Sequence, residues 1–293
     1  MEAVSIDLIL WLQNSKGTLI ETFFQFISFL GEAYVYIAVL GVVYWAFSKK
    51  MGEYLATTLG LSLTVNNLIK GLTRIDRPFE THAEIENLRP YTSSGSSFPS
   101  GHTQGISSFA SAIAFHLKKR IWWIAAVVLI ILMMFSRMYL GVHYLRDVLV
   151  GGVLGILIAV GHGILFNRFY EDRKHLRRYY IVLVIVFLPF LFILSNNNFF
   201  QGYGIMSGLI LAASLEHAHV GFSLDKPWKV LALRVVAGFA LLGITLLALK
   251  GLFSLLGFEE GTLGYNMLDF LRYFLLAIVG FYIYPMAFKR LGY

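Results

Sequence analysis

Three short segments of the chain combine the residue types that phosphate chemistry uses. They are residues 70–78 (KGLTRIDRP), residues 99–102 (PSGH) and residues 136–147, which include Ser136, Arg137, His143 and Asp147. If the segments meet, Lys70, Arg77 and Arg137 place three cations around one position, where they repel each other unless an anion lies between them. Arginine binds phosphate through a planar fork and lysine as a point charge. The three cations therefore predict a phosphate site.

The second segment precedes a predicted helix and suits the same anion. Backbone N–H groups at the start of a helix point toward a bound anion, and the Ser100 hydroxyl can join them. We therefore expect Ser100 and Gly101 to contact the phosphate, together with Lys70, Arg77 and Arg137.

The two histidines and the aspartate supply a nucleophile and an acid. His143 and Asp147 are four residues apart, which places them on one face of a helical turn. An aspartate that accepts from one ring nitrogen fixes the tautomer and leaves the other nitrogen free to attack. His102, beside the phosphate, can give a proton to the leaving oxygen, while the cations stabilise the transferring group. This scheme requires no metal and no cofactor.

Each of these residues also has an ordinary structural interpretation when it is taken alone. A Lys or Arg at a helix end commonly extends to the membrane interface, and a lone histidine is usually just packed. A serine before a helix is usually an N-cap, and an aspartate in a first turn compensates the helix dipole. The joint occurrence of the three segments on one membrane face favours the catalytic interpretation.

The elements that position these segments are membrane helices. The chain has 293 residues, of which 57% are hydrophobic and 14% charged, whereas a soluble domain is about 25% charged. This composition excludes a soluble globular enzyme, a disordered chain and a nucleic-acid-binding domain. The net charge of +7 fits loops that face an anionic leaflet. The absence of cysteine excludes disulfides and cysteine-ligated metals.

We expect an all-α integral membrane protein with ten helices. Residues 121–135 and 179–195 carry no charge, as bilayer-spanning segments require. The expected helices lie near 18–31, 33–48, 52–72, 102–118, 121–139, 146–168, 180–196, 203–220, 229–249 and 266–288. Residues 4–13 resemble an amphipathic interfacial helix, although packing into the core explains their pattern equally well. The acidic start of the chain argues against a signal peptide.

Two polar stretches interrupt the helices. Residues 73–101 form a long polar connection, and long structured loops are often functional. Residues 166–178 form a basic connector, where we place a boundary between two helical halves. Most Lys and Arg residues fall on the side of this connector and the termini, which predicts that both termini are cytoplasmic and that the three segments face outside. The compact chain suggests a bacterial plasma (inner) membrane.

The spacing K-x6-R-P, then P-S-G-H, then S-R-x5-H-x3-D resembles the type 2 phosphatidic acid phosphatase (PAP2) superfamily, which is related to the vanadium haloperoxidases and glucose-6-phosphatase. The resemblance covers residues from about 18 to 168. It implies a six-helix catalytic core, which we place at 1–168. Residues 169–293 lie outside the resemblance and are expected to supply about four additional transmembrane helices of unknown role.

The resemblance also implies metal-independent hydrolysis of a phosphate ester through a phosphohistidine. His143 would be the nucleophile, Asp147 its orienting partner and His102 the general acid. The phosphate-binding residues would be Lys70, Arg77, Ser100, Gly101 and Arg137. These roles agree with those read from the residues themselves.

A membrane-embedded site suits a lipid phosphate, such as undecaprenyl diphosphate, phosphatidylglycerophosphate, phosphatidic acid or diacylglycerol diphosphate. The motifs contact only the phosphate, so they leave the lipid open. Three alternatives stay open: a lipid phosphotransferase, a phosphatase for a soluble ester, and a lipid transporter or scramblase that uses the added helices. These helices could equally support a homo-oligomer.

Four smaller features carry weaker predictions. Residues 216–219 (EHAH) invite a metal interpretation, but a polar interfacial turn is the simpler one. Residues 257–261 are expected to be a solvated loop. Asn66 and Asn67, within an expected helix, can bond between helices or serve the phosphate site. Gly151, Gly155 and Gly161 suggest close helix packing.

Overall fold

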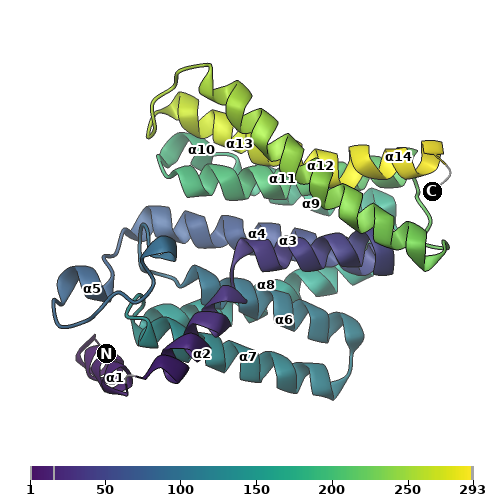
Figure 1. Cartoon of the computed structure of the whole chain (residues 1–293). Helices are drawn as coiled ribbons and strands as arrows, with labels where there is room; N and C mark the ends of the chain where they lie inside the picture. The colour runs from purple at the N-terminus through teal and green to yellow at the C-terminus, as the bar shows by residue number, and fades with distance from the viewer. Residues whose placement is uncertain (1, 16, 292–293) are drawn as a thin grey trace. The chain divides into compact units, whose positions relative to one another are not determined.

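The computed structural model describes residues 2–15 and 17–291. The helices in residues 2–169 are α1 (Glu2–Asn14), α2 (Thr18–Phe29), α3 (Ala33–Val42), the π-helix η1 (Val43–Phe47), α4 (Lys49–Thr73), α5 (Pro78–Thr81), the 3₁₀ turn η2 (Pro90–Thr92), α6 (Gly101–Leu117), α7 (Arg120–Tyr139) and α8 (Leu145–Phe169). They continue with α9 (Arg173–Phe187), α10 (Phe190–Ile193), α11 (Asn197–His219), α12 (Trp228–Ser254), α13 (Leu263–Ile278), the π-helix η3 (Val279–Ile283) and α14 (Tyr284–Leu291). The described residues contain no strand, so the predicted all-α class is confirmed (Figure 1).

The chain divides into two compact units that are not continuous in sequence. Unit 1 comprises residues 1–36 and 65–164, and unit 2 comprises residues 37–64 and 165–293. The long helix α4 contributes its first part to unit 2 and its last part to unit 1. Residues 37–64, which the sequence analysis assigns to the core at 1–168, therefore pack with the C-terminal helices.

Every expected helix is present, but two helices begin clearly earlier than expected. Helix α11, expected at 203–220, begins six residues earlier, at Asn197. The expected helix at 180–196 begins seven residues earlier, at Arg173, so the expected connector at 166–178 shrinks to the three residues between α8 and α9. The Asp172 side chain accepts a hydrogen bond from the His175 N–H and caps α9. The charged residues 173–178 are thus the first turns of a helix, whereas the sequence analysis treated their charge as a sign of a loop.

Among the described residues, five helical segments are long and apolar enough to cross a membrane. They are residues 120–139, 145–169, 173–193, 228–254 and 263–290, and α2 with the α3–η1 segment forms a sixth if that pair, bent by 53°, is one span. The chain is therefore a multi-pass membrane protein. The helices α4, α6 and α11 fall short of this criterion although they were expected as membrane helices.

The physical reason is that these helices bury polar side chains against protein. Helix α6 buries Ser107, Ser108 and Ser111, and α11 buries Ser207 and Glu216. A helix surrounded by protein does not need the apolar surface that lipid demands, because its polar groups find partners inside.

Unit 1 is held together by close helix contacts. Helices α6 and α7 run side by side (Figure 1). A Cβ atom on Gly155 would lie 2.5 Å from the Gln104 carbonyl oxygen, and one on Gly151 would lie 2.7 Å from that of Ser100. The expected close packing at these two glycines is confirmed. It is wrong for Gly161, because a Cβ atom there would meet no described heavy atom within 4 Å.

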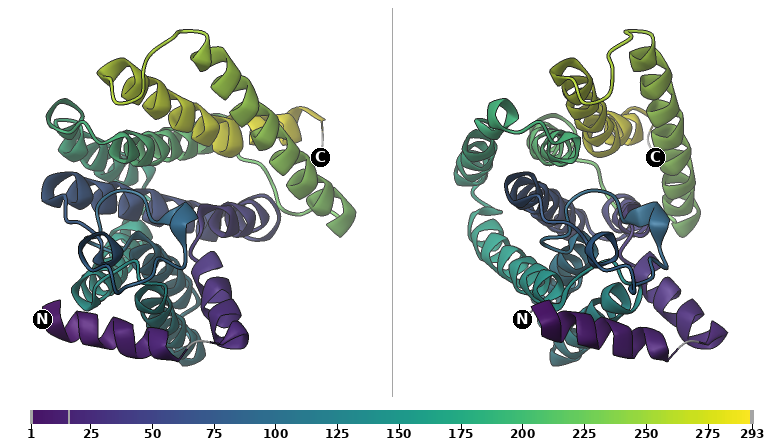
Figure 2. Two further views of the ribbon diagram at one scale, coloured as in Figure 1. Left: turned by 60° about the vertical axis from the view of Figure 1, so that its left-hand side comes forward. Right: turned by 90° about the vertical axis from the view of Figure 1, so that its left-hand side faces the viewer.

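Helix α1 fastens the polar connection between α4 and α6 to unit 1. Ile9 and Leu12 are buried in a cluster that includes Ile85. The buried Gln13 side chain donates to the carbonyl oxygens of Glu86 (2.8 Å) and Tyr139 (3.1 Å) and accepts from the Glu86 N–H. Figure 2 shows α1 beside this connection. The pattern of residues 4–13 thus includes packing into the core.

Unit 2 contains two π-helices that bond to one another. Trp45 in η1 donates its indole N–H to the Gly280 carbonyl oxygen in η3 at 2.9 Å, and the Tyr44 hydroxyl donates to that of Phe281 at 3.1 Å. A π-helix shifts the backbone register, which exposes carbonyl oxygens to outside donors. The paired π-helices therefore join α3 to the C-terminal hairpin of α12 and α13 within this unit.

The turn between α7 and α8 yields a prediction at Gly141. This residue has φ +74°, and a Cβ atom there would lie 2.2 Å from the Glu86 carbonyl oxygen. Gly141→Ala should destabilise the protein by more than the ~1–2 kcal/mol that a left-handed residue alone costs. Melting in detergent at a fixed scan rate checks this.

The matched control is Gly257→Ala, where φ is +68° and nothing lies within 4 Å of the added Cβ atom. It carries only the conformational cost. Equal melting temperatures for the two variants would contradict the close approach of Glu86 to this turn.

Candidate active site

The first two catalytic segments are joined by backbone and side-chain hydrogen bonds. The Ser97 N–H donates to the Ile75 carbonyl oxygen at 2.7 Å, and the Ile75 N–H donates to the Ser96 hydroxyl at 3.0 Å. Lys70, in the last turn of α4, donates its ammonium to the Ser96 and Ser97 carbonyl oxygens. These bonds bring residues 70–78 against the segment that leads into α6.

The second segment meets the third where α6 begins. The Ser100 N–H donates to the Asp147 carbonyl oxygen at 3.0 Å, and the Ser100 side chain caps α6 by accepting from Thr103. Asn66 of α4 donates to the Pro99 carbonyl oxygen and, at 2.9 Å, to the Gln104 side chain. The expected bonding between helices is therefore confirmed for Asn66, whereas its service to the phosphate site stays a prediction.

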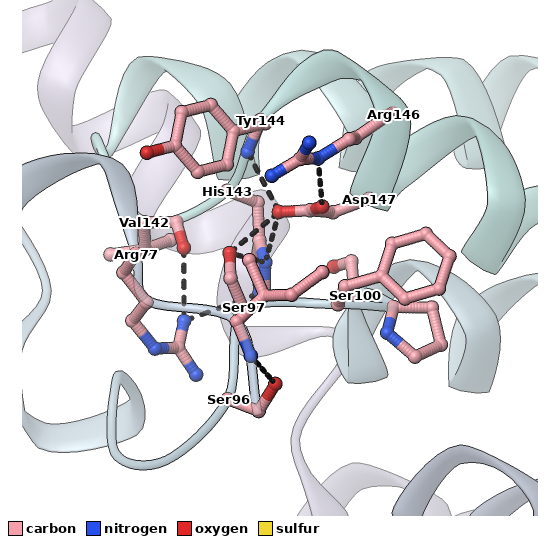
Figure 3. Close-up of polar contacts among 12 residues, drawn as sticks. Arg77, Ser96, Ser97, Ser100, Val142, His143, Tyr144, Arg146 and Asp147 are labelled. Carbon is pink, nitrogen blue, oxygen red and sulfur yellow. Dashed lines mark hydrogen bonds and ion pairs between the residues drawn. The ribbon is translucent and has the colours of Figure 1, made fainter. Parts of the chain in front are cut away.

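His143 is bound on one side by a carboxylate and a hydroxyl (Figure 3). Its Nδ1 atom lies 3.3 Å from the Ser97 hydroxyl and 3.5 Å from the Asp147 Oδ2 atom. The same Oδ2 atom accepts from the Ser97 hydroxyl at 2.5 Å and from the Tyr144 N–H at 2.9 Å. His143 and Asp147 therefore meet as expected, but not as neighbours in one helical turn. His143 precedes α8, and the Asp147 side chain folds back onto the residues before this helix.

Arg77 lies on the opposite side of the imidazole. Its Nη1 atom is 3.4 Å from the His143 Nε2 atom. The guanidinium also donates to the carbonyl oxygens of Gly95, Val142 and Ser94, each at 2.9 Å. Figure 3 shows the contact with Val142. Three backbone carbonyls fix this cation in place, yet none of them neutralises its charge. The His143 Nε2 atom therefore faces a positive charge that can hold an anion.

Arg137 and His102 have unused hydrogen-bonding capacity. Arg137 is fully buried, and its Nη1 atom donates to the Ser28 hydroxyl. Its Nε and Nη2 atoms, and the buried Nε2 atom of His102, have no hydrogen-bond partner among the described residues. A buried charge that lacks partners costs several kcal/mol. An anion would satisfy these groups.

The surrounding cations act on the charge of His143. Burial, followed by the charges of Arg77, Arg137 and Lys70, lowers the pKa of His143 well below its usual range. The imidazole is therefore neutral at neutral pH and keeps a lone pair, as a nucleophile must. Burial also lowers the pKa of Arg77 to about 10, so its guanidinium is still charged at neutral pH.

All eight expected site residues lie in unit 1. Direct contacts join Arg77, Ser100, His143 and Asp147, and Lys70 reaches them through the Ser96–Ser97 backbone. Within the described part of the chain, Arg137 and His102 make no direct hydrogen bond to this group, and Arg137 acts on His143 through its charge. The roles assigned to these residues stay predictions.

Sequence reasoning missed Ser97, which contacts both His143 and Asp147. The signal was weak, because Ser97 belongs to a run that also contains Ser93, Ser94 and Ser96. In the sequence, Ser97 differs from the other serines only in lying three residues before Ser100. That separation does not indicate a contact with His143 until the fold is known.

The expected polar turn at 216–219 is the end of α11, where Glu216 is buried and pairs with Lys49 at 2.5 Å. No group of three or more His, Cys, Asp or Glu side chains in the described residues could hold a metal ion. Residues 257–261 are exposed, as expected of a solvated loop.

The site geometry and the fold agree with comparisons to known proteins. Residues 53–171 match the family model of the PAP2 superfamily, and residues 200–293 match that of the PAP2 superfamily phosphatase transmembrane extension. The chain belongs to the PAP2 superfamily and is a phosphatase of that type. The resemblance seen in the sequence is therefore confirmed.

Three similar proteins illustrate the range of this family. The chain is 35% identical to the undecaprenyl-diphosphatase BcrC of Bacillus subtilis over 141 residues, which cover 47% of this chain and 69% of that protein. It is 38% identical to phosphatidylglycerophosphatase B of Bacillus subtilis over 88 residues, which cover 25% of this chain and 43% of that protein. The crystal structure of Aquifex aeolicus LpxE has a TM-score of 0.50 at 25% identity and covers 54% of this chain and 94% of that one.

The position of Ser97 yields a prediction about the rate. Ser97→Ala should lower the turnover number at least tenfold, because Asp147 loses a hydrogen bond and His143 loses its closest Nδ1 neighbour. The Michaelis constant should change little, because the Ser97 hydroxyl contacts only His143 and Asp147 in the described site, and the Ser97 carbonyl oxygen that accepts from Lys70 is unchanged. Steady-state kinetics in detergent separate the two constants.

Ser111→Ala is the matched control, because Ser111 is also a fully buried serine of unit 1 and its hydroxyl has no partner among the described residues. Equal turnover numbers for the two variants would contradict a positioning role for Ser97.

Proposed function

We propose that this protein is a metal-independent lipid phosphatase that works through a phosphohistidine on His143. One observation carries the proposal: Ser97 and Asp147 contact the Nδ1 atom of His143, while its Nε2 atom faces the Arg77 cation. Nδ1–H donates to the Ser97–Asp147 side, which leaves the Nε2 lone pair directed at the place where a phosphate would bind.

The proposed reaction has two steps. In the first, the His143 Nε2 atom attacks phosphorus, a P–N bond forms, and the bond from phosphorus to the leaving oxygen breaks. His102 enters this step protonated, because the negative charge of the bound phosphate favours the imidazolium, and it gives that proton to the leaving oxygen. In the second step, water attacks phosphorus, gives a proton to His102 and releases phosphate from His143. Protons, charges and bonds balance over the two steps, and no redox partner is required.

The cations serve the phosphate in both steps. Arg77 and Lys70 are fixed by backbone carbonyls, so they need little rearrangement when charge develops on the phosphoryl oxygens. Arg137 offers the N–H groups of its Nε and Nη2 atoms, which have no partner among the described residues. The Gly101 backbone, at the start of α6, adds the helix N-terminus together with Ser100.

We propose a lipid diphosphate of the undecaprenyl type as the first substrate to test. The similarity to an undecaprenyl-diphosphatase extends over the larger part of that relative, whereas the similarity to a phosphatidylglycerophosphatase covers less than half of its length. Phosphate release from undecaprenyl diphosphate, phosphatidylglycerophosphate, phosphatidic acid and glucose 6-phosphate ranks these substrates. Transfer of the phosphate to a second lipid without release would instead indicate a phosphotransferase.

We further propose that the site faces outside, with both termini in the cytoplasm and residues 1–168 carrying the chemistry. The distribution of Lys and Arg supports this orientation. A cysteine placed in the exposed loop at 257–261 should react with a membrane-impermeant reagent in intact cells. Reaction only after the cells are opened would overturn the orientation without affecting the chemistry.

The nucleophile assignment predicts a complete loss of turnover. His143→Ala should reduce phosphate release to background, because no other described side chain of the site offers a neutral lone pair in that position. His162→Ala is the control, since His162 is also a buried histidine of unit 1. Substantial phosphate release from purified His143→Ala protein would exclude the phosphohistidine.

Removal of divalent metals should leave the activity intact. The site residues supply a nucleophile, an acid and three cations, so a chelator removes nothing that the proposed steps use. Phosphate release is measured before and after dialysis against the chelator. A loss of activity that an added divalent ion restores would contradict the scheme.

A further inference from the structure

Unit 2 contains a second polar pocket that the proposed reaction does not use. Its volume is about 160 Å³, room for several water molecules. The pocket lies between α4, α9 and α11, and its polar lining includes Glu53, Arg173, Arg177, Tyr180, Ser214 and His217. All of these residues belong to unit 2, whereas the candidate active site lies in unit 1.

At the inner end of the pocket lies the carboxylate of Glu53, which already has hydrogen-bond partners in the protein. Glu53 is 1% exposed, and its Oε1 atom accepts from the Tyr180 hydroxyl at 3.0 Å. Its Oε2 atom lies 2.7 Å from the His217 Nε2 atom. Glu53 therefore already has two partners inside the protein, and its charge needs no ligand.

The position of Arg173 creates a conflict that a ligand would resolve. Its Nη1 atom lies 2.9 Å from the same His217 Nε2 atom that contacts Glu53. A ring nitrogen carries either one hydrogen or one lone pair, so it serves only one of these neighbours. The carboxylate contact is the shorter one, and a guanidinium can only donate. If Nε2–H donates to Glu53, that Arg173 N–H group faces a donor and lacks an acceptor. The guanidinium also lies over the Tyr170 ring, 4.0 Å from its centroid, which stabilises its charge but supplies no acceptor for that N–H group.

Arg177 adds a second cation at the same pocket. Within the described part of the chain, neither arginine has a carboxylate within ion-pair distance, and Arg177 makes no hydrogen bond. Arg173, Arg177 and Tyr180 occupy one face of α9, because they are spaced four and three residues apart. Two guanidinium groups against the single carboxylate of Glu53 leave the pocket lining with a net positive charge.

We propose that this pocket binds a phosphate group, with Arg173 and Arg177 as its ligands. The guanidinium fork matches phosphate oxygens, and basic pockets between membrane helices bind the head groups of anionic lipids. Arg177 is exposed and Arg173 is partly buried, so the phosphate enters from the surface while the Glu53 carboxylate stays inside. The phosphate belongs either to an anionic phospholipid or to free inorganic phosphate. This proposal is independent of the catalytic one.

Native mass spectrometry of the full chain in detergent tests the site. The probes are phosphatidylglycerol, phosphatidylcholine and inorganic phosphate, each titrated against the wild type and Arg173→Gln/Arg177→Gln. We expect the double variant to bind phosphatidylglycerol at least tenfold more weakly. Arg177→Gln alone, at an exposed side chain without hydrogen bonds among the described residues, should weaken binding in the same direction with no cost to folding.

The matched control is Lys174→Gln/Arg178→Gln, which removes the same charge from the same helix at exposed positions outside the pocket lining. A loss confined to the pocket variants with phosphatidylglycerol identifies a lipid site. The same loss with inorganic phosphate alone identifies a free-phosphate site. Equal affinities in the wild type and the pocket variants, equal losses in the control, or binding of phosphatidylcholine alone would each overturn the proposal. Phosphate release by the catalytic site is a separate readout, so either proposal can fail alone.

Discussion

The candidate active site depends on the burial of positive charge without a matching negative charge. Arg77 and Arg137 are almost fully buried, and Lys70 is partly buried. Their partners in the protein are mainly backbone carbonyls and a serine hydroxyl, which orient a cation without cancelling its charge. Such an arrangement is costly in the empty protein and favourable once an anion binds. Burial, together with the charge of these cations, lowers the pKa of His143 and keeps its imidazole neutral. The same arrangement therefore serves both phosphate binding and nucleophilic attack.

Much of unit 1 holds that charge in place. The Gln13 side chain fastens the Glu86 backbone, Gly141 lets this backbone approach the turn before His143, and Gly151 lets α8 approach the start of α6. Ser97 then connects the carboxylate and the imidazole. These contacts come from segments far apart in the sequence, which is why a short polar connection could not replace residues 73–101.

The sequence was informative where chemistry demands particular residues at fixed spacing. His143, Asp147 and Arg77 could be identified because few other arrangements explain such residues in an apolar chain. The sequence was less informative where the role of a residue depends on its neighbours in the folded protein. Ser97 is one serine among several until Asp147 folds back toward it, and Gly161 looks like Gly155 until the neighbouring helix is placed. The polar helices α4, α6 and α11 lack the apolar pattern of membrane spans because protein surrounds much of their surface.

The central claim is that phosphate passes through a covalent bond to His143. The most direct measurement is a rapid quench with ³²P-labelled lipid diphosphate, followed by mass-spectrometric mapping of the labelled peptide. The account predicts an acid-labile label on His143 that forms and decays at the rate of turnover. Full phosphate release with no label on the protein, or with the label on another residue, would contradict it.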